Sequence, residues 1–316
     1  MIVRWGLEEL PGLLGELGVE RPLLVASRRW DGLGLDAAAR WDEIPSHRIE
    51  VLPGVDGVLA VGGGSAIDTA KAASSAEGLP LVSVPTTYSG AEWTPSFGIR
   101  DPNRRMRGGG GGAHLAGIVY EPRLTLELPR EQSAGTALNA LAHAAEALYH
   151  PSRNPESDEL AVEAAELIAE ALPAVVADGS DFEARTRLLE GAAAAGEALA
   201  RSGLCLGHAM AQALGGRYGL AHGAMNALCL PPALRFNQPV AGDEIEQLGQ
   251  AMAVTDPSAR VEELARLGGF ERLRDFGVPE EELDEVAEAT AARPGAQANP
   301  RPASPGEIAD LLRSIY

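Results

Sequence analysis

The stretch that decides the fold is GVLAVGGGSAIDTAKAAS, residues 57–74. Its first five residues, GVLAV (57–61), form a short apolar run that predicts a buried strand. Three glycines, Gly62, Gly63 and Gly64, follow this run directly, and Ser65 opens a predicted helix over 65–78. A strand, a glycine turn and a helix in this order are typical of a parallel sheet covered by helices.

Three more short apolar runs extend this pattern through the first 130 residues. They are PLLVAS (22–27), PLVSV (80–84) and AGIVY (116–120), each bounded by glycine, proline or polar residues. Runs of this length and composition predict strands that are buried on both faces of a parallel sheet. The front part of the chain is therefore predicted to be an α/β domain.

From Arg130 onward, Ala, Leu, Glu and Arg recur at helical spacing, which predicts a domain made only of helices. The periodic segments are 131–149, 156–177 and 182–201, and others follow. Expected breaks are Pro151, Pro155, Pro173, Gly203, Pro231, Pro239 and Pro257. We expect a boundary near Leu128, with an α/β domain of residues 1–128 and an all-helical domain of residues 129–316.

Three segments are expected to lack regular structure. The stretch 105–117, RMRGGGGGAHLAG, carries five consecutive glycines and predicts a mobile surface loop. The stretch 29–56 is too broken for a full crossover helix, and 292–306 is a proline-rich connector before a last short helix.

Composition excludes several classes of partner. The chain has 316 residues with 45 acidic and 26 basic side chains, and the net charge of −19 argues against nucleic acid or an anionic membrane surface. No apolar run approaches the roughly 18 residues that span a bilayer. Acidic residues follow the amino terminus too closely for a secretory signal, and Cys205 and Cys229 lie in apolar surroundings that predict buried thiols. We expect a cytoplasmic protein.

The glycine turn is suited to a phosphate group. Free N–H groups at a helix start, with the helix dipole behind them, favour a diphosphate, and the glycines of 62–64 let the backbone approach it closely. The alternative is a tight turn with Ser65 as N-cap. PLVSVPTT ends a second strand with Thr86 and Thr87. Ligands of open parallel sheets bind at the carboxyl ends of strands, so both ends predict one nucleotide site.

Four polar residues stand out in the helical part. Asn139 and His143 are four positions apart and so share one helix face. His208 and His222 would be about 21 Å apart in one continuous helix, at 1.5 Å per residue. The glycines at 215, 216 and 219 are expected to end the helix after Leu214 and fold the chain back.

Two interpretations of the histidines remain open at this point. Three imidazoles and an oxygen would suit Zn²⁺ or Fe²⁺ if His208 and His222 converge on Asn139 and His143. Alternatively, each histidine is a hydrogen-bonded residue of the core.

Four motifs in order resemble the iron-containing alcohol dehydrogenase superfamily. They are GGGSAIDTAK (62–71), PTTYSGAEWTPSFG (85–98), NALAHAAEALY (139–149) and GHAMAQALGGRYGLAHGAMNALCLPPALRFN (207–237). The second and third are closer to its maleylacetate reductase branch. The resemblance implies a Rossmann-like dinucleotide-binding α/β domain followed by an all-helical domain, the dehydroquinate synthase-like fold, with catalysis in a cleft between them.

The resemblance also implies a set of site residues. The cofactor diphosphate would lie on Gly62, Gly63, Gly64 and Ser65, with Asp68 nearby and with Thr86 and Thr87 lining the nucleotide. The metal of the family, where present, is held by an aspartate and three histidines, which correspond here to Asn139, His143, His208 and His222.

Three departures from the family pattern affect the chemistry. Asn139 replaces the aspartate, and a neutral amide is a weaker ligand; the maleylacetate reductase branch shares this change and is usually regarded as working without metal. Gln212 stands where the family often has a further histidine. Without metal, the histidines would donate a proton to the substrate or bind its carboxylate.

The end of the first predicted strand bears on cofactor choice. The family commonly has an aspartate there that binds the adenosine ribose, whereas this chain has Ala26, Ser27, Arg28 and Arg29. With no carboxylate and two guanidinium groups, the segment predicts tolerance of NADPH besides NADH. Two ordinary surface arginines are the alternative.

These observations lead to an NAD(P)-dependent oxidoreductase that transfers hydride between nicotinamide and a small carbonyl or alcohol. Two substrate classes remain open. The earlier motifs favour a carboxylated enone or keto acid, whereas HGAMNA (222–227), which resembles the alcohol dehydrogenases, favours a simple aldehyde or alcohol. Alternatives are a dehydroquinate synthase-type lyase that uses NAD transiently and a non-catalytic nucleotide-binding protein. The resemblance implies a homodimer.

Overall fold

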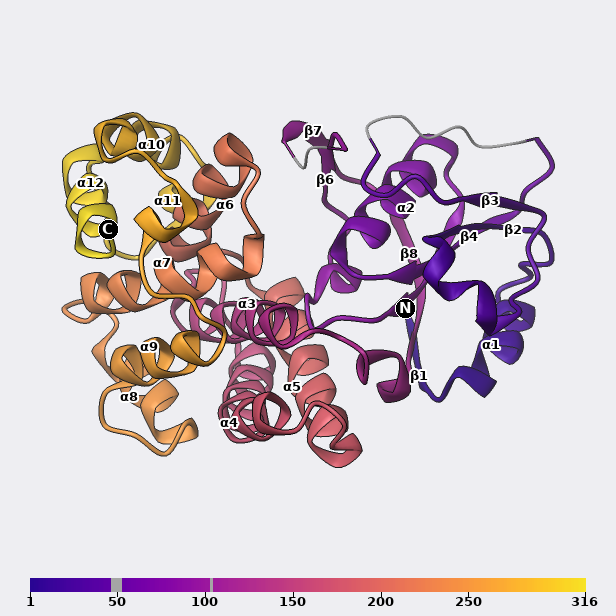
Figure 1. Cartoon of the computed structure of the whole chain (residues 1–316), viewed down its shortest axis with the longest axis horizontal. Helices are drawn as coiled ribbons and strands as arrows, with labels where there is room; N and C mark the ends of the chain where they lie inside the picture. Colours follow the sequence, from indigo (N-terminus) through magenta and orange to yellow (C-terminus); the bar gives the residue numbers. More distant parts are fainter. Residues whose placement is uncertain (47–52, 103–104) are drawn as a thin grey trace. The chain divides into compact units, whose positions relative to one another are not determined.

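The computed structural model describes residues 1–46, 53–102 and 105–316, which form two compact units (Figure 1). The first unit contains Met1–Thr87 and Ala91–Leu126, and the second contains Tyr88–Gly90 and Glu127–Tyr316. A short internal segment, Tyr88–Gly90, thus belongs with the helical part although both its neighbours in sequence belong to the first unit.

A six-stranded parallel sheet forms the centre of the first unit, with strand order β1-β8-β5-β4-β2-β3. The strands are β1 (Ile2–Trp5), β2 (Pro22–Ala26), β3 (Ala39–Trp41), β4 (Gly57–Gly62), β5 (Pro80–Pro85) and β8 (His114–Tyr120). The four predicted strands are confirmed as β2, β4, β5 and β8. The two edge strands, β1 and β3, are short and carry polar residues, and the sequence did not indicate them.

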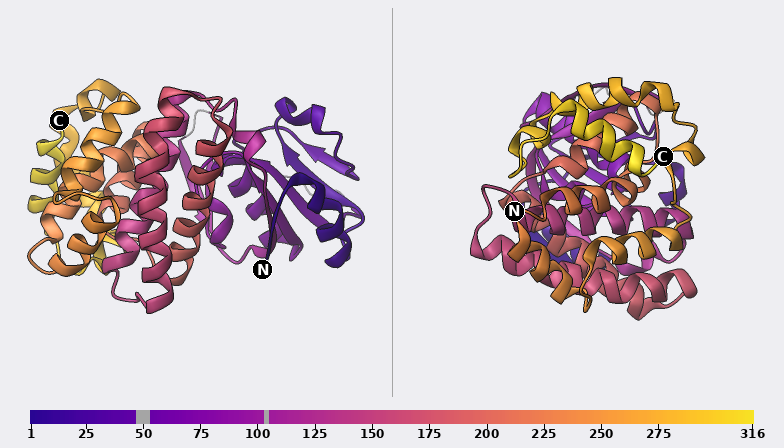
Figure 2. Two further views of the ribbon diagram at one scale, coloured as in Figure 1. Left: turned by 90° about the horizontal axis from the view of Figure 1, so that it is seen from below. Right: turned by 90° about the vertical axis from the view of Figure 1, so that its left-hand side faces the viewer.

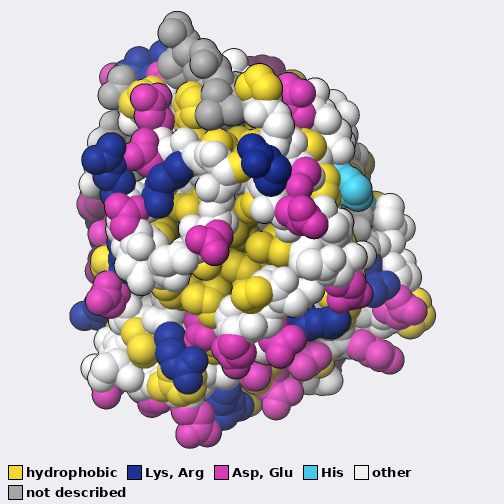
Figure 3. All heavy atoms as spheres, turned by 90° about the vertical axis from the view of Figure 1, so that its right-hand side faces the viewer, with side chains coloured by type: hydrophobic (Ala, Val, Ile, Leu, Met, Phe, Trp, Pro, Cys, Tyr) yellow, Lys and Arg dark blue, Asp and Glu magenta, His cyan; other side chains and the backbone are white. Residues whose placement is uncertain are grey.

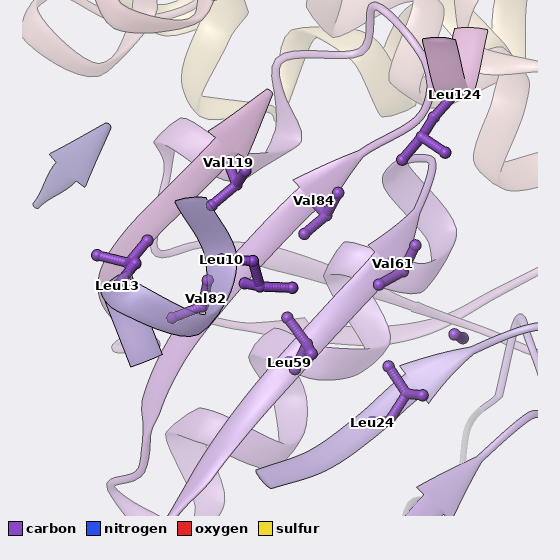
Figure 4. Close-up of a cluster of buried hydrophobic side chains, with 10 residues drawn as sticks. Leu10, Leu13, Leu24, Leu59, Val61, Val82, Val84, Val119 and Leu124 are labelled. Carbon is purple, nitrogen blue, oxygen red and sulfur yellow. The ribbon is translucent and has the colours of Figure 1, made fainter. Parts of the chain in front are cut away.

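One helix covers each face of the sheet. Leu10 and Leu13 of α1 (Leu10–Glu16) point onto the strands, where they meet Leu59, Val82 and their neighbours (Figure 4). On the opposite face, Ile67 of α2 (Gly64–Glu77) packs with alternate residues of the same strands. Burying a side chain of this size stabilises the fold by about 1.5–3 kcal/mol, so central strands that are apolar on both faces are expected.

The described part of the connection from β2 to β4 contains no long helix. Its described residues form a 3₁₀ helix, Arg28–Leu33, and the short strand β3, as the broken sequence predicts; the part of this prediction that concerns residues 47–52 lies outside the described residues. Trp30 and Leu33 pack against the core but stay partly exposed. Figure 3 views the first unit from the right-hand side of Figure 1 and shows hydrophobic side chains at the floor of a hollow.

The prediction that 105–117 contains no regular element is wrong, although residues 106–110 are exposed at the surface as predicted. Met106–Gly110 forms strand β7, which pairs antiparallel with β6 (Phe97–Arg100), and β8 begins at His114. The glycines permit this pairing because a Cβ on Gly110 would lie 2.6 Å from the Phe97 ring. In the folded hairpin, the missing side chain of Gly110 thus leaves room for the Phe97 ring on the neighbouring strand.

The second unit consists of helices, coloured magenta to yellow in Figures 1 and 2. They are α3 (Arg130–Tyr149), α4 (Pro155–Ala177), α5 (Phe182–Arg201), α6 (Leu206–Tyr218), α7 (His222–Asn237), α8 (Gly242–Ala251), α9 (Pro257–Leu267), α10 (Leu283–Ala291), α11 (Pro294–Ala298) and α12 (Pro305–Ser314). The predicted helices 131–149, 156–177 and 182–201 are confirmed. The 16 buried residues of α3 pack against α4, α5 and α7, so α3 forms the core of this unit.

Two of the expected helix breaks are wrong. Pro173 lies inside α4, and Pro231 lies inside α7. A proline within a helix costs about 3 kcal/mol, and burial of the surrounding apolar residues of α7 offsets this cost. The stretch 292–306, expected to be a connector, contains α11. Among the described residues, no helix is long and apolar enough to cross a membrane.

Candidate functional site

The glycine turn between β4 and α2 leaves a helix start open. Gly62 has a φ of +153°, which residues with a side chain rarely adopt, and a Cβ on Gly63 would lie 2.8 Å from the Thr87 methyl group. Gly63 is the N-cap of α2, and among the described residues no side chain caps the helix, so the predicted cap by Ser65 is wrong. This open start, with its helix dipole, is suited to an anion.

Thr86 and Thr87 follow β5 next to this turn. The sheet register pairs Gly62 with Pro85, and the N–H of Thr86 donates to the carbonyl oxygen of Gly62 at 3.1 Å. Within the described residues, the buried Oγ1 of Thr87 has no hydrogen-bond partner. A buried hydroxyl without a partner is unfavourable, and a polar ligand on the turn would supply one.

Asp68 binds protein groups in this structure. One carboxyl oxygen accepts the N–H of Gly98 at 3.2 Å, and the other lies 3.4 Å from the Lys71 ammonium. Lys71 is fully buried and also donates to the carbonyl oxygen of Ser96 at 2.9 Å. Burial raises the pKa of Asp68 and lowers the pKa of Lys71. The pair therefore connects the β6 segment to α2.

The sequence did not indicate a buried acid beside this motif. Glu92 is 2% exposed, and its Oε1 accepts the hydroxyl of Tyr120 at 2.8 Å, to which Trp93 Nε1 also donates at 2.8 Å. Burial raises the pKa of Glu92. Glu92 lies seven residues after Pro85 in the motif PTTYSGAEWTPSFG (85–98), and this position could have drawn attention to it in the sequence.

The segment at the end of β2, residues 26–29, contains no carboxylate, but the structure brings two carboxylates from later in the chain to it or close to it. Ser27 follows β2 at the same sheet edge as the glycine turn, because Ala26 pairs with Val61. Arg28 Nε lies 2.7 Å from an oxygen of Asp42, and Arg40 forms an ion pair with Asp31. Residues 9 and 14 positions apart meet here because β3 runs parallel to β2, which the sequence did not reveal.

In the second unit, the three predicted histidines lie together. The rings of His143 and His208 are stacked, with centroids 4.7 Å apart, and the His208 and His222 centroids are 5.9 Å apart. The fold-back between α6 and α7 is thus confirmed. The helix does not end after Leu214, however, but continues to Tyr218, and Gly219 with φ +74° ends it.

A glycine contact brings His222 to this cluster. A Cβ on Gly223 would lie 2.2 Å from the carbonyl oxygen of Gly135, so the start of α7 touches the backbone of α3. Gly135 precedes Asn139 by one helical turn. Any side chain at Gly223 would separate the two helices and move His222 away from Asn139.

Two amides link the histidines. Asn139 Nδ2 donates to the carbonyl oxygen of Ser89 at 2.8 Å, and its Oδ1 accepts Nδ2 of Asn226 at 2.6 Å. The same Nδ2 of Asn226 lies 3.1 Å from Nε2 of His222. Asn226 was missed in the sequence, although it follows His222 by four positions, the spacing that relates Asn139 and His143.

Glu146 supports His208 from α3. The carboxyl group is fully buried and accepts the backbone N–H groups of Cys205 at 2.6 Å and His208 at 3.1 Å. One of its oxygens also lies 2.8 Å from Nδ1 of His208. A Cβ on Gly207 would lie 2.9 Å from the other oxygen, so glycine is needed there. Glu146 shares the helix face of Asn139 and His143, a spacing that could have revealed it.

The cluster presents imidazole nitrogens to a ligand. Among the described residues, the buried Nδ1 of His143 and Nε2 of His208 have no hydrogen-bond partner. Burial, followed by the neighbouring His208 and His222, lowers the pKa of His143 well below its ordinary value, so this ring is neutral near pH 7. Neutral imidazoles in an apolar setting can hydrogen-bond a carbonyl oxygen or hydroxyl.

The residues as they stand do not fit a metal ion. Within residues 1–46, 53–102 and 105–316, no three His, Cys, Asp or Glu side chains are placed to share one. Stacking prevents His143 and His208 from directing their lone pairs at one point. The fourth position is the neutral amide of Asn139, whose oxygen already accepts from Asn226.

Comparisons with known proteins match both the front and the rear part of the chain to one family. Residues 133–316 match the C-terminal part of the Fe-containing alcohol dehydrogenase family, and residues 52–114 match iron-containing alcohol dehydrogenase. Maleylacetate reductase 1 of Rhodococcus opacus is 34% identical over 310 residues, which cover 98% of this chain and 84% of the relative.

Solved structures show the same fold along the whole chain. Maleylacetate reductase from Agrobacterium tumefaciens aligns with a TM-score of 0.87 and 29% identity, covering 100% of this chain and 95% of that one. For an iron-containing alcohol dehydrogenase from Corynebacterium glutamicum the TM-score is 0.88 at 27% identity, with coverage of 100% and 94%. This chain therefore belongs to the Fe-containing alcohol dehydrogenase family, and it is an oxidoreductase.

Proposed function

We propose that the protein reduces a small carbonyl compound with NADPH or NADH, and that a carboxylated enone of the maleylacetate type is its substrate. Membership of the family implies a nicotinamide cofactor and a metal of the iron type. The observation that carries the proposal is the cluster of His143, His208 and His222, because it supplies hydrogen-bonding imidazoles in a buried setting.

The cofactor part of the proposal rests on the glycine turn. The backbone of Gly62–Ser65 would hold the diphosphate, and the Thr87 hydroxyl, which has no hydrogen-bond partner within the described part of the chain, would hydrogen-bond the nucleotide. When bound, the nicotinamide supplies the hydride. Ser27 and Arg28 lie at the same sheet edge and would contact the adenosine ribose.

Acceptance of NADPH depends on Arg28. This arginine is exposed, and its ion pair with Asp42 is weak because water solvates both groups. It can therefore exchange Asp42 for a 2′-phosphate, to which a guanidinium group binds in a bidentate manner. Asp42 itself could bind the ribose hydroxyls of NADH, which supports use of both cofactors.

The histidine side chains would bind the substrate and supply the proton that its oxygen needs. Reduction of a carbonyl requires a hydride on carbon and a proton on oxygen. His222, whose Nε2 lies 3.1 Å from the amide Nδ2 of Asn226, would carry its hydrogen on Nδ1 and give this proton to the substrate oxygen, and neutral His143 would keep the stacked ring of His208 in place. Since the residues do not fit a metal ion in this arrangement, no step is assigned to one.

Residues 1–128 would thus bind the dinucleotide and residues 129–316 the substrate, in a cytoplasmic homodimer. Hydride transfer needs the cofactor C4 within about 3–3.5 Å of the reacting carbon. The relatives named maleylacetate reductase support this division, because the similarity covers both parts of the chain.

The test is cofactor consumption by the purified protein with a panel of carbonyl compounds. The panel contains maleylacetate, other short keto acids and enones with a carboxylate, and simple aldehydes. We expect oxidation of NADPH with maleylacetate. Turnover of simple aldehydes alone would favour an alcohol dehydrogenase, a changed substrate without net NADPH oxidation would indicate a lyase, and tight NADPH binding without turnover would indicate a binding protein.

A further inference from the structure

Arg293 lies in the proline-rich segment after α10, to which the sequence assigned no function. It is the N-cap residue of α11, and its guanidinium group reaches Gln212 on α6. Nη1 lies 3.4 Å from the Gln212 side-chain oxygen, and Nη2 lies 3.3 Å from the Gln212 carbonyl oxygen. Both helices that flank Arg293, α10 and α11, pack against α6.

The partners of this arginine are neutral. Among the described residues, no Asp or Glu forms an ion pair with Arg293, and its buried Nε has no hydrogen-bond partner. Arg217, on the same helix α6, pairs instead with Glu282 and Glu285. Burial lowers the pKa of Arg293. A half-buried guanidinium group without an anion is unfavourable, and a bound carboxylate would relieve this cost.

Gln212 connects Arg293 to the histidine cluster. It follows His208 by four residues on α6, so their side chains lie on one helix face, with Cβ atoms about 6 Å apart. Side chains on a helix lean toward its N-terminus, which directs Gln212 toward His208. Gln212 and His222 are partly exposed, whereas His208 is fully buried.

We propose that Arg293 binds a carboxylate of the substrate, with Gln212 orienting the guanidinium group, while the reacting carbonyl group lies at His208 and His222. The inference rests on the proposed function and specifies its substrate class: a short carbonyl compound whose carboxylate is a few carbon atoms from the reacting group. Gln212 suits this role because its amide oxygen accepts from the guanidinium group, whereas a protonated histidine would repel it.

The test compares Arg293→Gln and Arg293→Lys with the wild type, using maleylacetate and the simple aldehyde of the panel that the wild type reduces fastest. For Arg293→Gln we expect KM for maleylacetate to rise about 30- to 100-fold, with kcat within about 3-fold and KM for NADPH unchanged, because a charge-assisted pair is lost. Arg293→Lys keeps the charge and should retain part of the affinity. The aldehyde kinetics should not change.

The matched control is Arg217→Gln, which removes an arginine that is paired with Glu282 and Glu285 on the same helix. It should leave KM for maleylacetate unchanged. An equal loss for the aldehyde and for maleylacetate in Arg293→Gln, or no loss for either, would overturn the assignment.

A binding measurement separates this inference from the proposed function. Maleate, a dicarboxylate that cannot accept hydride at a carbonyl carbon, is titrated by calorimetry into the protein saturated with NADP⁺. Weaker maleate binding in Arg293→Gln supports the carboxylate site even if maleylacetate is not turned over. Turnover of maleylacetate with the same KM in the wild type and in Arg293→Gln would leave the proposed function intact and would refute the role of Arg293.

Discussion

Glu146 shows how one buried carboxyl group holds a helix start and an imidazole ring at once. Its two oxygens accept the backbone N–H groups of Cys205 and His208, which begin α6, and one of them accepts from Nδ1 of His208. The hydrogen on Nδ1 leaves Nε2 as the nitrogen that faces the cluster. The side chain of His208 therefore depends on a residue that never reaches the substrate in the proposed arrangement.

Substitution of Glu146 by Gln should lower activity more than stability. The amide keeps one acceptor oxygen for the start of α6 but loses the fixed acceptor for Nδ1 of His208, so we expect kcat to fall roughly 10- to 100-fold. The measurements are steady-state kinetics and nitrogen NMR of the histidine rings, which reports which ring nitrogen carries hydrogen. An unchanged His208 tautomer together with wild-type kcat would contradict the role of Glu146.

Asn139 stands at the position that an aspartate holds in the metal-binding members of the family, and we expect its neutral amide to disfavour a metal. Asn139→Asp replaces a neutral amide by an anionic oxygen, so we expect more bound Fe or Zn in the variant than in the wild type, which should carry little. The metal content of freshly purified protein is measured by elemental analysis. Asn226→Asp serves as the control, because it adds the same charge one contact further away. Full stoichiometric Fe or Zn in the wild type would refute this expectation.

At the scale of the element, the turn that begins α2 requires two residues without side chains, Gly62 and Gly63. Gly63 has an ordinary extended backbone, so only the nearby Thr87 side chain forbids a larger residue there. The neighbouring Gly62 is restricted by its own φ of +153°. The turn therefore contains one glycine required by backbone conformation and one required by a close approach.

This distinction predicts a rescue. Gly63→Ala places a methyl group 2.8 Å from the Thr87 methyl carbon and should weaken NADPH binding at least about 10-fold, because the turn must shift. Thr87→Ser removes that methyl group and keeps the hydroxyl, so the double variant should recover part of the affinity. Fluorescence titration of NADPH measures both. Equal affinity of the double variant and Gly63→Ala would exclude the steric explanation.

At the scale of the whole molecule, the chain passes between its two units after Thr87, Gly90 and Leu126. Arg185 of α5 holds two of the segments by which the chain enters the second unit: it donates to the Tyr88 hydroxyl at 3.2 Å and to the Leu128 carbonyl oxygen at 3.1 Å. Because these contacts are buried, the entry points are well defined within the second unit.

Ligand binding should stabilise the whole chain in a way that depends on the glycine turn. NADPH at 100 times its Kd contributes about 2.7 kcal/mol to the free energy of unfolding, which for a chain of this length raises Tm by roughly 4 °C. Calorimetry with and without NADPH measures this shift, and Gly63→Ala at the same NADPH concentration should show a smaller one. An equal shift in both proteins would place the cofactor elsewhere.

Much of the fold could be predicted because the signals are local. The strands β2, β4, β5 and β8 are apolar on both faces, and the long helices repeat their apolar residues at 3.6-residue spacing. The edge strands β1 and β3 lack such a signal, since they are short and half exposed. The hairpin of β6 and β7 was missed because a run of glycines has no side chains and therefore shows no alternation of apolar and polar residues.

In the candidate site too, the local features could be predicted from the sequence, whereas the contacts between helices could not. The sequence by itself determined which residue types lie at helix starts and on shared helix faces: the glycine turn at 62–64, the pair Asn139 and His143, and the presence of His208 and His222. Only the tertiary structure decided what they contact, including Glu146 on His208, Asn226 on Asn139 and Arg293 on Gln212. Spacing along a helix is a property of the local backbone, whereas contacts between helices depend on packing details such as the glycines that let α7 touch α3.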